Sequence, residues 1–483
     1  MAGQDDGGRK AALTLHIVVV GCGLGGLAAA HTLAHAGHHI TLLEAAPVIG
    51  DVGAGIQVSP NAARLLLRWG LGSALSATAV RPEAIVFRRY DTGERVGYTR
   101  WGDVMDRSHG APYLHVHRAD YHAMLLRLAR AAPNVTLRLG ATVIGVDPDP
   151  ASAVGGPSVT LASGEVVRGD LVVGADGVKS MLQAAVTGKS SAPRATGDAA
   201  YRAIIPTDVM LRDPELRPFV ETPEMTAWMA PGRHLMAYNI RGKKEFNLVL
   251  LHPDDGSVES WTAEGSADKM RADFKDFEPR VQKLLAYVNS TLKWRLMDRP
   301  ALDSWVHPKG RIVLLGDACH PMLPYRAQGA AMAIEDAGVL GALLSHLSTI
   351  EELPVLLKAY QDLRLDRTSD AQEQSRLNRS IFHLPDGPEQ CARDAEMRRA
   401  MAAEFAALEH AGGHPASVSA SLADGETLMV GNPNQWADRR KSERQFSYDA
   451  DGAVHGWWTA GGRALLEEAR ARTEAAAKAK AKL

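Results

Sequence analysis

The segment from residue 15 to residue 44 constrains the fold of this chain more than any other. A short β-branched run at 15–20 (LHIVVV) leads directly into Gly21-x-Gly23-x-x-Gly26, and an alanine-rich stretch follows. A second apolar run ends at Glu44, 23 positions after Gly21. The order strand, glycine-rich turn, helix and strand predicts one βαβ unit with its turn shaped for a dinucleotide.

Each part of this motif has a physical role toward a phosphate-bearing ligand. Glycine lets the backbone approach a pyrophosphate closely, and the helix that opens near Leu24 offers N–H groups and a partial positive charge. An acidic residue about 20 positions after the first glycine accepts hydrogen bonds from a ribose hydroxyl, and Glu44 fits this role. We therefore predict an adenine dinucleotide site; the alternative is a tight turn that binds nothing.

The composition excludes several classes of protein. The chain has 483 residues, of which 46% are hydrophobic and 23% charged, and this favours two or three folded domains. A formal net charge of −2 argues against a nucleic-acid partner or stable membrane association and favours small-molecule partners. Three cysteines without a CxxC pair predict neither structural disulfides nor a metal site.

The two ends of the chain carry weaker signals. Residues 1–14 begin with a polar, glycine-rich stretch, from which we expect a disordered tail and no secretory signal. The chain ends in Ala-Lys-Leu, one residue different from the Ser-Lys-Leu peroxisomal address. We expect a cytoplasmic protein, with peroxisomal import as the alternative; the same residues also fit the frayed end of an Ala/Lys helix.

Two later passages repeat the pattern of a strand followed by a glycine turn. An apolar strand at 170–174 ends in Gly174-Ala-Asp176-Gly177, and a strand at 312–315 leads into Gly316-Asp317. Between them, residues 198–252 alternate in apolar and polar runs separated by Pro and Gly, which predicts antiparallel sheet. The sequence thus predicts an α/β fold in which a nucleotide-binding domain is interrupted by an antiparallel insert.

Taken together, the three motifs resemble those of the single-component (class A) FAD-dependent aromatic hydroxylases, in particular the salicylate hydroxylase-like branch. The likeness covers about residues 15–380. It rests on the first glycine motif with Glu44, on Gly174-Ala-Asp176-Gly177-x-x-Ser180, and on Gly316-Asp317-Ala-x-His320-Pro with Gln328-Gly329 downstream.

The resemblance implies a discontinuous domain organisation. A Rossmann-like, glutathione-reductase-like FAD-binding domain would be interrupted by an antiparallel-sheet substrate domain and followed by a C-terminal extension whose sequence shows little periodicity. The expected boundaries are 15–75, 105–185 and 300–380 for the FAD-binding domain, 76–104 and 186–299 for the substrate domain, and 381–483 for the extension.

The resemblance also implies where FAD binds. Asp317 would hold the ribityl chain, with a turn aspartate as the alternative, and Arg118 would contact the cofactor, with a surface ion pair as the alternative. The helix that opens at Gly329 and Ala330 would stabilise negative charge on the reduced flavin. The other implied cofactor-binding residues are Gly21, Gly23, Leu24, Gly26, Glu44, Gly55, Ile56, Gln57 and Asp176.

One position departs from the family pattern. Family members usually place an arginine seven residues after the motif aspartate, where this chain has Gln183. That signature is thought to serve both FAD and the pyridine nucleotide, so the departure leaves NADH or NADPH open as reductant. No second GxGxxG follows a strand, and we expect NAD(P)H to bind transiently over the flavin.

The reaction that the resemblance implies is a monooxygenation. NAD(P)H reduces FAD, dioxygen adds to give a flavin C4a-hydroperoxide, and its distal oxygen attacks a phenol or hydroxybenzoate. Salicylate or another carboxylated phenol is the favoured substrate, with decarboxylation where oxygen enters the carbon bearing the carboxylate. The protein must exclude water and hold the phenol as phenolate, which requires a cationic or hydrogen-bonding group in an apolar pocket.

Two residues of the antiparallel segment are the catalytic candidates. Tyr201 and Arg202 point to opposite faces of one strand, so only one of them can face the pocket, and a permanently charged arginine suits a phenolate or carboxylate. Tyr238 is the second candidate, although a core aromatic is the alternative. His234 is a weaker candidate whose place near a strand start favours solvent, and His320 fits a structural role in its turn better than that of a general base.

Other functions share these motifs. A tailoring monooxygenase acting on a larger polyketide or indole substrate would carry the same residues. A flavin oxidase or a non-catalytic flavin-binding protein would also keep the FAD fold. The sequence leaves open the oligomeric state and the role of residues 381–483.

Overall fold

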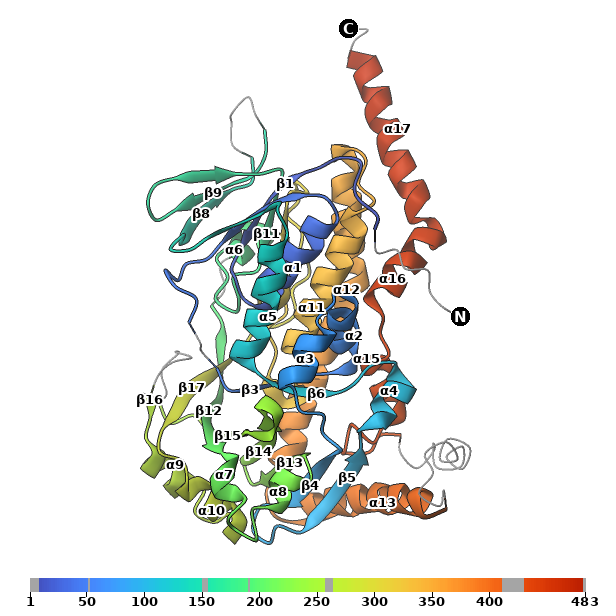
Figure 1. Cartoon of the computed structure of the whole chain (residues 1–483). Coiled ribbons are helices and arrows are strands. Elements are labelled where there is room, and N and C mark those ends of the chain that lie inside the picture. Colours follow the sequence, from blue (N-terminus) through green and yellow to red (C-terminus); the bar gives the residue numbers. More distant parts are fainter. Residues whose placement is uncertain are drawn as a thin grey trace.

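Two sheets of different construction organise the computed structural model of this chain (Figure 1). The structure describes residues 8–50, 53–149, 155–189, 192–256, 264–410 and 430–480. One sheet has five strands that all run parallel, and the other has eight strands that are mainly antiparallel. This confirms the predicted α/β fold with an antiparallel insert and a C-terminal extension.

The parallel sheet brings the three sequence motifs to one edge. Its strand order is β18-β11-β1-β2-β7, so the three strands that precede glycine motifs are neighbours. Because carboxyl ends of parallel strands meet at the same edge, the loops after them also meet there. The strands are β1 (His16–Val20), β2 (His39–Leu43), β7 (Val135–Arg138), β11 (Leu171–Gly174) and β18 (Ile312–Leu314).

Helices cover this sheet, as the near-continuous apolar character of its strands requires. Helix α1 packs against both α5 and α11, and the contact with α11 is close because Thr32 donates its hydroxyl hydrogen bond to the Ala337 carbonyl at 2.7 Å. Opposite Thr32, Gly341 has no room for a side chain. The helices are α1 (Leu24–His35), α5 (Arg118–Ala131) and α11 (Gly329–Leu344).

The second sheet presents one face to the motif loops and the other to short helices. Its order is β16-β17-β12-β15-β14-β13-β4-β5, and it is antiparallel except that β4 and β13 run parallel. The strands are β4 (Ala84–Arg89), β5 (Arg95–Arg100), β12 (Arg194–Pro206), β13 (Glu224–Ala230), β14 (Arg233–Ile240), β15 (Glu245–Pro253), β16 (Glu264–Gly265) and β17 (Thr291–Asp298).

Two smaller sheets and several short helices complete the fold. A two-stranded antiparallel pair, β3 (Gly55–Val58) with β6 (Leu114–His117), leads into α5. A three-stranded sheet consists of β8 (Val143–Asp147), β9 (Ser158–Leu161) and β10 (Val166–Arg168). The shorter helices are α2 (Pro60–Arg68), α3 (Gly72–Thr78), α4 (Asp103–His109), α6 (Leu182–Thr187), α7 (Thr207–Met210), α8 (Pro218–Glu221), α9 (Ala267–Asp273) and α10 (Pro279–Ala286).

The C-terminal extension is more helical than its weak periodicity suggests. Helix α13 lies along the edge strand β5, where the rings of Tyr98 and Phe405 are 4.9 Å apart, and α17 projects past the rest of the molecule (Figure 1). Helix α12 (Leu353–Phe382) precedes the extension, whose helices are α13 (Pro388–His410), α15 (Arg439–Phe446), α16 (Ala450–Trp457) and α17 (Arg463–Lys480).

Part of each end of the chain belongs to the described residues. Residues 8–14, expected within a disordered tail, make backbone hydrogen bonds from Ala11 to Ala36 and from Ala12 to Leu347. The first seven residues and the terminal Ala-Lys-Leu, including the candidate peroxisomal signal, lie outside the described residues.

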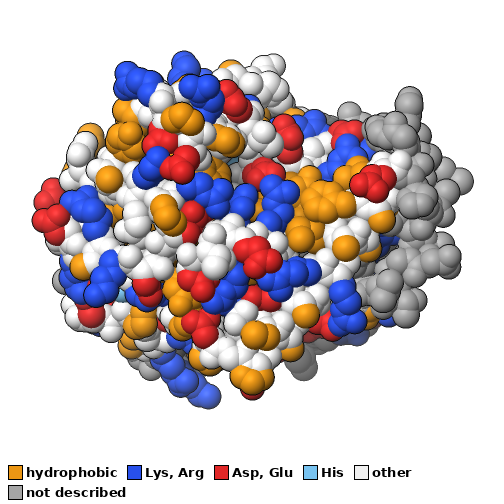
Figure 2. All heavy atoms as spheres, turned by 90° about the horizontal axis from the view of Figure 1, so that it is seen from below, with side chains coloured by type: hydrophobic (Ala, Val, Ile, Leu, Met, Phe, Trp, Pro, Cys, Tyr) orange, Lys and Arg blue, Asp and Glu red, His pale blue; other side chains and the backbone are white. Residues whose placement is uncertain are grey.

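Two features of the described residues are the distribution of charge on one face and the apolar length of the helices. Figure 2 shows acidic and basic side chains interspersed on the face seen from below, so this face presents no single sign of charge. Within the described ranges, no helix combines the length and the apolar character that a membrane span requires.

The contact between α1 and α11 generates a stability prediction. In Gly341→Ala the added Cβ would lie 2.5 Å from the Thr32 Cβ and 3.0 Å from its backbone carbon. Because neither helix can move away without disturbing the core, we expect the free energy of unfolding to fall by about 1–3 kcal/mol in chemical denaturation. Gly456→Ala in α16 is the control, since its Cβ meets nothing within 4 Å; a loss as large in the control would contradict this explanation.

Candidate active site

The first glycine loop forms an open backbone cradle. Gly21 has a φ of +104°, and a Cβ on Gly26 would lie 1.9 Å from the Gly21 carbonyl oxygen, so both positions require glycine. Gly23 is different, because a Cβ there would meet nothing within 4 Å. It is the N-cap of α1 and provides no side-chain cap, so no hydrogen bond from its own side chain occupies the N–H groups of the first turn. The cradle therefore fits a phosphate group.

Glu44 is fixed at the mouth of this cradle. One carboxylate oxygen accepts the Cys22 N–H at 2.9 Å and the other accepts the Ala46 N–H at 2.8 Å. Each carboxylate oxygen retains a further lone pair, so Glu44 can still accept hydrogen bonds from ribose hydroxyls. A cavity of about 390 Å³ lies on this nucleotide side, lined by α5, β7 and Ile49–Gly50, and His122 in its wall is 2.7 Å from the Cys22 carbonyl oxygen.

Asp317 and Arg118 face the same space. Asp317 lies in a 3-10 turn after β18, and its side chain is solvent-accessible. Enclosure by the surrounding protein nevertheless raises the pKa of Asp317, while nearby His320 and Arg118 lower it. Burial lowers the pKa of Arg118, with the charge of Asp317 opposing it. A carboxylate and a guanidinium from two different elements thus lie near each other, as a ribityl and phosphate chain would need.

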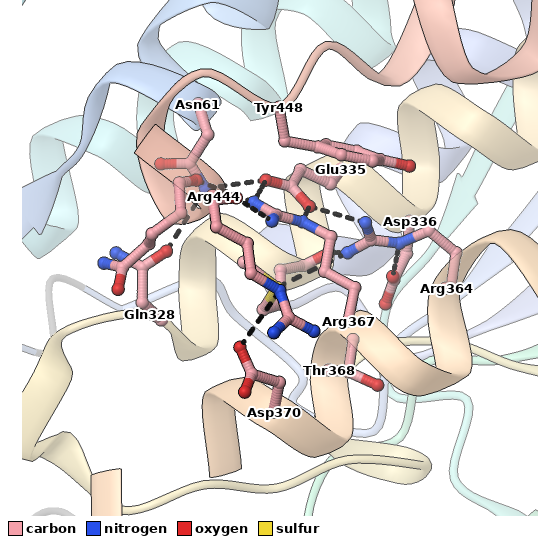
Figure 3. Close-up of polar contacts among 12 residues, drawn as sticks. Asn61, Gln328, Glu335, Asp336, Arg364, Arg367, Thr368, Asp370, Arg444 and Tyr448 are labelled. Carbon is pink, nitrogen blue, oxygen red and sulfur yellow. Dashed lines mark hydrogen bonds and ion pairs between the residues drawn. The ribbon is translucent and has the colours of Figure 1, made fainter. Parts of the chain in front are cut away.

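A buried charge cluster supports the turn that carries Asp317 (Figure 3). Asp336 on α11 accepts hydrogen bonds from the Gly316 N–H at 3.0 Å, from His320 Nε2 at 2.5 Å and from Arg364 Nε at 2.8 Å. Burial raises the pKa of Asp336, but His320 and Arg364 outweigh it and hold the pKa below its ordinary value. His320 therefore has a structural partner, as its sequence context suggested.

Glu335 extends this cluster toward the start of α11. Its carboxylate is paired with Arg364 at 2.5 Å and Arg367 at 2.7 Å, and it accepts the Asn61 side-chain N–H at 2.6 Å (Figure 3). Asn61 also donates to Gln328 at 3.2 Å. The same buried charges thus support both the Asp317 turn and the amino end of α11.

The amino end of α11 is partly accessible to solvent, and the backbone just before it is strained. Gly329 and Ala330 are half-buried, whereas most of the helix after them is buried, and the N-cap residue Gln328 makes no side-chain cap bond. The preceding Ala327 has a φ of +53°, a left-handed conformation that costs a non-glycine residue about 1–2 kcal/mol. Uncapped N–H groups at this end can stabilise an anion.

Gln183 stands where the family pattern has an arginine, and the guanidinium that contacts it comes from Arg299 in another segment. Gln183 is buried, and its side-chain oxygen accepts a hydrogen bond from Arg299, which also donates to the Val178 carbonyl at 2.8 Å. Asp176 accepts the Met181 N–H at 2.9 Å and raises the pKa of Arg299, which burial lowers. A guanidinium thus supports the Asp176 loop from the segment after β17. Sequence reasoning missed Arg299 because no motif marks it.

Arg202 and Tyr238 lie together on the face of the second sheet that is turned to the cofactor residues. The guanidinium carbon of Arg202 is 4.3 Å from the centroid of the Trp294 ring. Burial lowers the pKa of Arg202 to about 10, with Tyr238 raising it and Arg118 lowering it further. Its Nε makes no hydrogen bond, and no carboxylate of the described residues pairs with it. Tyr201 points to the opposite face and donates to Asp273 at 3.0 Å.

The first residue of β3, Gly55, packs directly on Tyr238. A Cβ on Gly55 would lie 2.6 Å from the Tyr238 ring, and the Gly55 N–H donates to the Asn247 side chain at 2.7 Å. Tyr238 is 3% exposed, and burial raises its pKa to about 12, although Arg202 and a hydrogen bond with Gln57 lower it. The Tyr113 hydroxyl also donates to Gln57, at 2.5 Å. Sequence reasoning missed Asn247 and Tyr113, which only the fold brings here.

The expectation for His234 is wrong. The residue is 2% exposed, and its Nδ1 is 2.8 Å from Nε2 of His383 at the end of α12. Burial lowers its pKa well below the ordinary value, so the ring is neutral. The sequence placed it near solvent because the covering residue is 149 positions away.

One group of side chains in the described residues has the spacing of metal ligands. Cys319, His320 and Asp336 place ligand atoms within 4.8 Å of one another, all buried. Asp336 is already bonded to Arg364, His320 and the Gly316 N–H, so the group belongs to the charge cluster.

Comparisons with known proteins agree with this geometry. Residues 14–375 match the model of a family described as FAD binding domain. The FAD-dependent monooxygenase OpS4 of Beauveria bassiana is 41% identical over 386 residues, covering 79% of this chain and 89% of OpS4. The 3-amino-4-hydroxybenzoate 2-monooxygenase PtmB3 of Streptomyces platensis is 37% identical over 383 residues, covering 79% of this chain and 92% of PtmB3.

Two solved structures resemble the fold. HpxO of Klebsiella pneumoniae in complex with FAD and uric acid superposes with a TM-score of 0.68 at 25% identity, covering 80% of this chain and 93% of HpxO. A salicylate hydroxylase substrate complex gives a TM-score of 0.67 at 23% identity, covering 84% of this chain and 97% of that one.

The charge cluster generates a prediction about stability and its pH dependence. Arg364→Leu leaves Glu335 and Asp336 buried with less compensation, so we expect the free energy of unfolding at pH 7 to fall by about 3–5 kcal/mol. Both carboxylates have lowered pKa values in the folded chain, so their contribution is present above their unfolded pKa of about 4 and is lost as pH falls through the folded pKa.

Urea unfolding is measured over a series of pH values. The free energy of unfolding of Arg364→Leu should therefore come closer to that of wild type as the pH falls below about 4. Lys358→Ala, on the same helix in an exposed pair with Asp362, is the control and should change stability by less than about 1 kcal/mol. A pH-independent difference between wild type and Arg364→Leu would contradict the assignment to these carboxylates.

Proposed function

The chain belongs to the FAD-binding family of flavoprotein monooxygenases whose relatives include aromatic hydroxylases, and on this premise we propose that it hydroxylates an anionic aromatic compound with NAD(P)H and dioxygen. The substrate class is a phenol or hydroxybenzoate. Salicylate-type compounds are included, with loss of the carboxylate where oxygen enters the carbon that bears it.

The residues that would hold FAD are those that fit its parts chemically. The Gly21–Gly26 cradle would hold the pyrophosphate, Glu44 the ribose, Asp317 and Arg118 the chain between phosphate and ring, and the amino end of α11 the flavin pyrimidine. When bound, FAD supplies the reducing electrons from NAD(P)H to dioxygen and so delivers one oxygen atom to the ring. The chain's own residues must then bind and orient the aromatic compound.

The single observation that carries the proposed substrate class is that Arg202 has no carboxylate partner in the described residues. Arg202 is half-buried, so a ligand anion can complete the pair. Its fork of donors suits a carboxylate or phenolate, and Trp294 holds it in place. The named substrate of the relative PtmB3, 3-amino-4-hydroxybenzoate, carries both of these groups.

Tyr238 would orient the ring beside Arg202. With a pKa of about 12 its hydroxyl remains protonated at neutral pH, so it can donate a hydrogen bond to a phenolate oxygen. The half-buried side chains of Ile204, Met236 and Val249 pack against the core of the same face and would exclude water around the reacting carbon. The site thus combines one cation, one hydrogen-bond donor and an apolar surround.

The function is tested by NAD(P)H oxidation with the purified FAD-loaded protein and a panel of phenols, hydroxybenzoates and non-aromatic amines. We expect one or more carboxylated phenols to accelerate oxidation at least tenfold and to gain one oxygen atom by mass spectrometry. Anaerobic flavin reduction by an amine or alcohol without NAD(P)H would instead show an oxidase and overturn the proposal.

Arg202→Met should weaken the binding of an anionic substrate selectively. Loss of a charge-assisted hydrogen bond of about 1.5–3 kcal/mol corresponds to a rise of about 10- to 150-fold in KM for a hydroxybenzoate. The neighbouring Tyr201→Phe, on the opposite face of the strand, is the control and should leave KM within twofold. Equal KM values for Arg202→Met and wild type would show that Arg202 does not bind the substrate.

A further inference from the structure

We propose that residues 430–457, here termed the C-terminal strap, are part of the flavin-binding framework and act through Arg326 as a positioning residue. The strap lies beyond residues 14–375, which match the family model, and the family motifs give it no role. The inference rests on the proposed placement of the flavin at the amino end of α11.

Arg326 is held by the strap. Its side chain is 1% exposed, its guanidinium donates a hydrogen bond to the Gln445 side chain, and its guanidinium carbon lies 4.7 Å from the centroid of the Trp436 ring. Nε and Nη1 of Arg326 have no hydrogen-bond partner in the described residues. The guanidinium's hydrogen bond and ring contact thus come from Gln445 and Trp436, both of the strap, while the nearby Asp438 of the strap, together with Tyr113 and Asp370, also favours its charge.

The anchored arginine immediately precedes the strained residue of the flavin-side loop. Ala327 has its positive φ between Arg326, which is tied to the strap, and Gln328, which donates to Ser59 at 3.0 Å and accepts from Asn61 at 3.2 Å. A left-handed non-glycine residue persists only where its surroundings determine the backbone, and such residues cluster at ligand sites. Arg326 and Gln328 are these two anchors, and Gly329 follows them directly.

The strap is independently fastened to the charge cluster. Arg367, which pairs with Glu335, donates to the carbonyls of Arg444 and Gln445 at 2.7 Å each. Its guanidinium carbon is 4.1 Å from the centroid of the Tyr448 ring (Figure 3). The strap therefore contacts both supports of the α11 amino end, the charge cluster and the loop before it.

The test measures FAD release from the full-length FAD-loaded protein, by the recovery of flavin fluorescence on dilution. Arg326→Met should raise the FAD dissociation constant at least tenfold, and Gln445→Ala should raise it at least threefold without removing a large buried side chain. Arg68→Met is the matched control, because Arg68 binds the strap through Asp449 and Asp451 but does not touch the loop; its dissociation constant should stay within twofold of wild type.

A rescue variant separates positioning from general support. Glycine adopts a positive φ without strain, so Ala327→Gly added to Arg326→Met should restore FAD affinity to within threefold of wild type. Wild-type affinity in Arg326→Met, or a loss that Ala327→Gly does not reverse, would overturn the role of Arg326. Where Arg326→Met does not fold, Gln445→Ala with and without Ala327→Gly decides by the same criterion.

Asp317→Ala distinguishes failure of this inference from failure of the flavin placement. If Asp317→Ala binds FAD as wild type does, the proposed cofactor site itself is wrong. If Asp317→Ala weakens FAD while Arg326→Met and Gln445→Ala do not, only the role of the strap is wrong.

Discussion

Arg364 lies between Glu335 and Asp336 with all three side chains inaccessible to solvent, and the geometry of the candidate site depends on this pairing. Asp336 holds the turn that presents Asp317, and Glu335 holds Asn61 and through it Gln328. Two loops that are adjacent at the edge of the parallel sheet thus share one electrostatic support. Burial of three charges is costly unless each is paired, so the cluster specifies one arrangement of these loops.

The substrate side of the candidate site, which Arg202 and Tyr238 form, carries a charge that no protein carboxylate in the described residues compensates. Arg202 is half-buried, and Tyr238 beside it keeps its proton at neutral pH. The charge cluster on the cofactor side is therefore internally compensated, whereas Arg202 on the substrate side is left to be compensated by a ligand. This asymmetry is what a site needs if it is to keep its shape before an anionic aromatic compound binds.

Local patterns in the sequence predicted the parts of the fold that depend on neighbouring residues. The glycine motif with Glu44, the Gly316-Asp317 turn and the opposite orientation of Tyr201 and Arg202 follow from backbone periodicity and turn chemistry. The burial of His234 against His383 and the support of Gln183 by Arg299 could not be predicted in this way. Both contacts join segments more than 100 residues apart, and no local pattern encodes them. The strap was missed for the same reason, since its short helices are held by Arg64, Arg367 and Arg326 rather than by their own periodicity.

A crystal structure of the FAD complex with a bound hydroxybenzoate tests the central claim most directly. The account predicts the isoalloxazine ring between the amino end of α11 and the sheet face that carries Arg202, with the substrate's anionic group on the Arg202 guanidinium. A ring bound away from Gly329 and Ala330, or an Arg202 paired with a protein carboxylate while the substrate lies elsewhere, would contradict it.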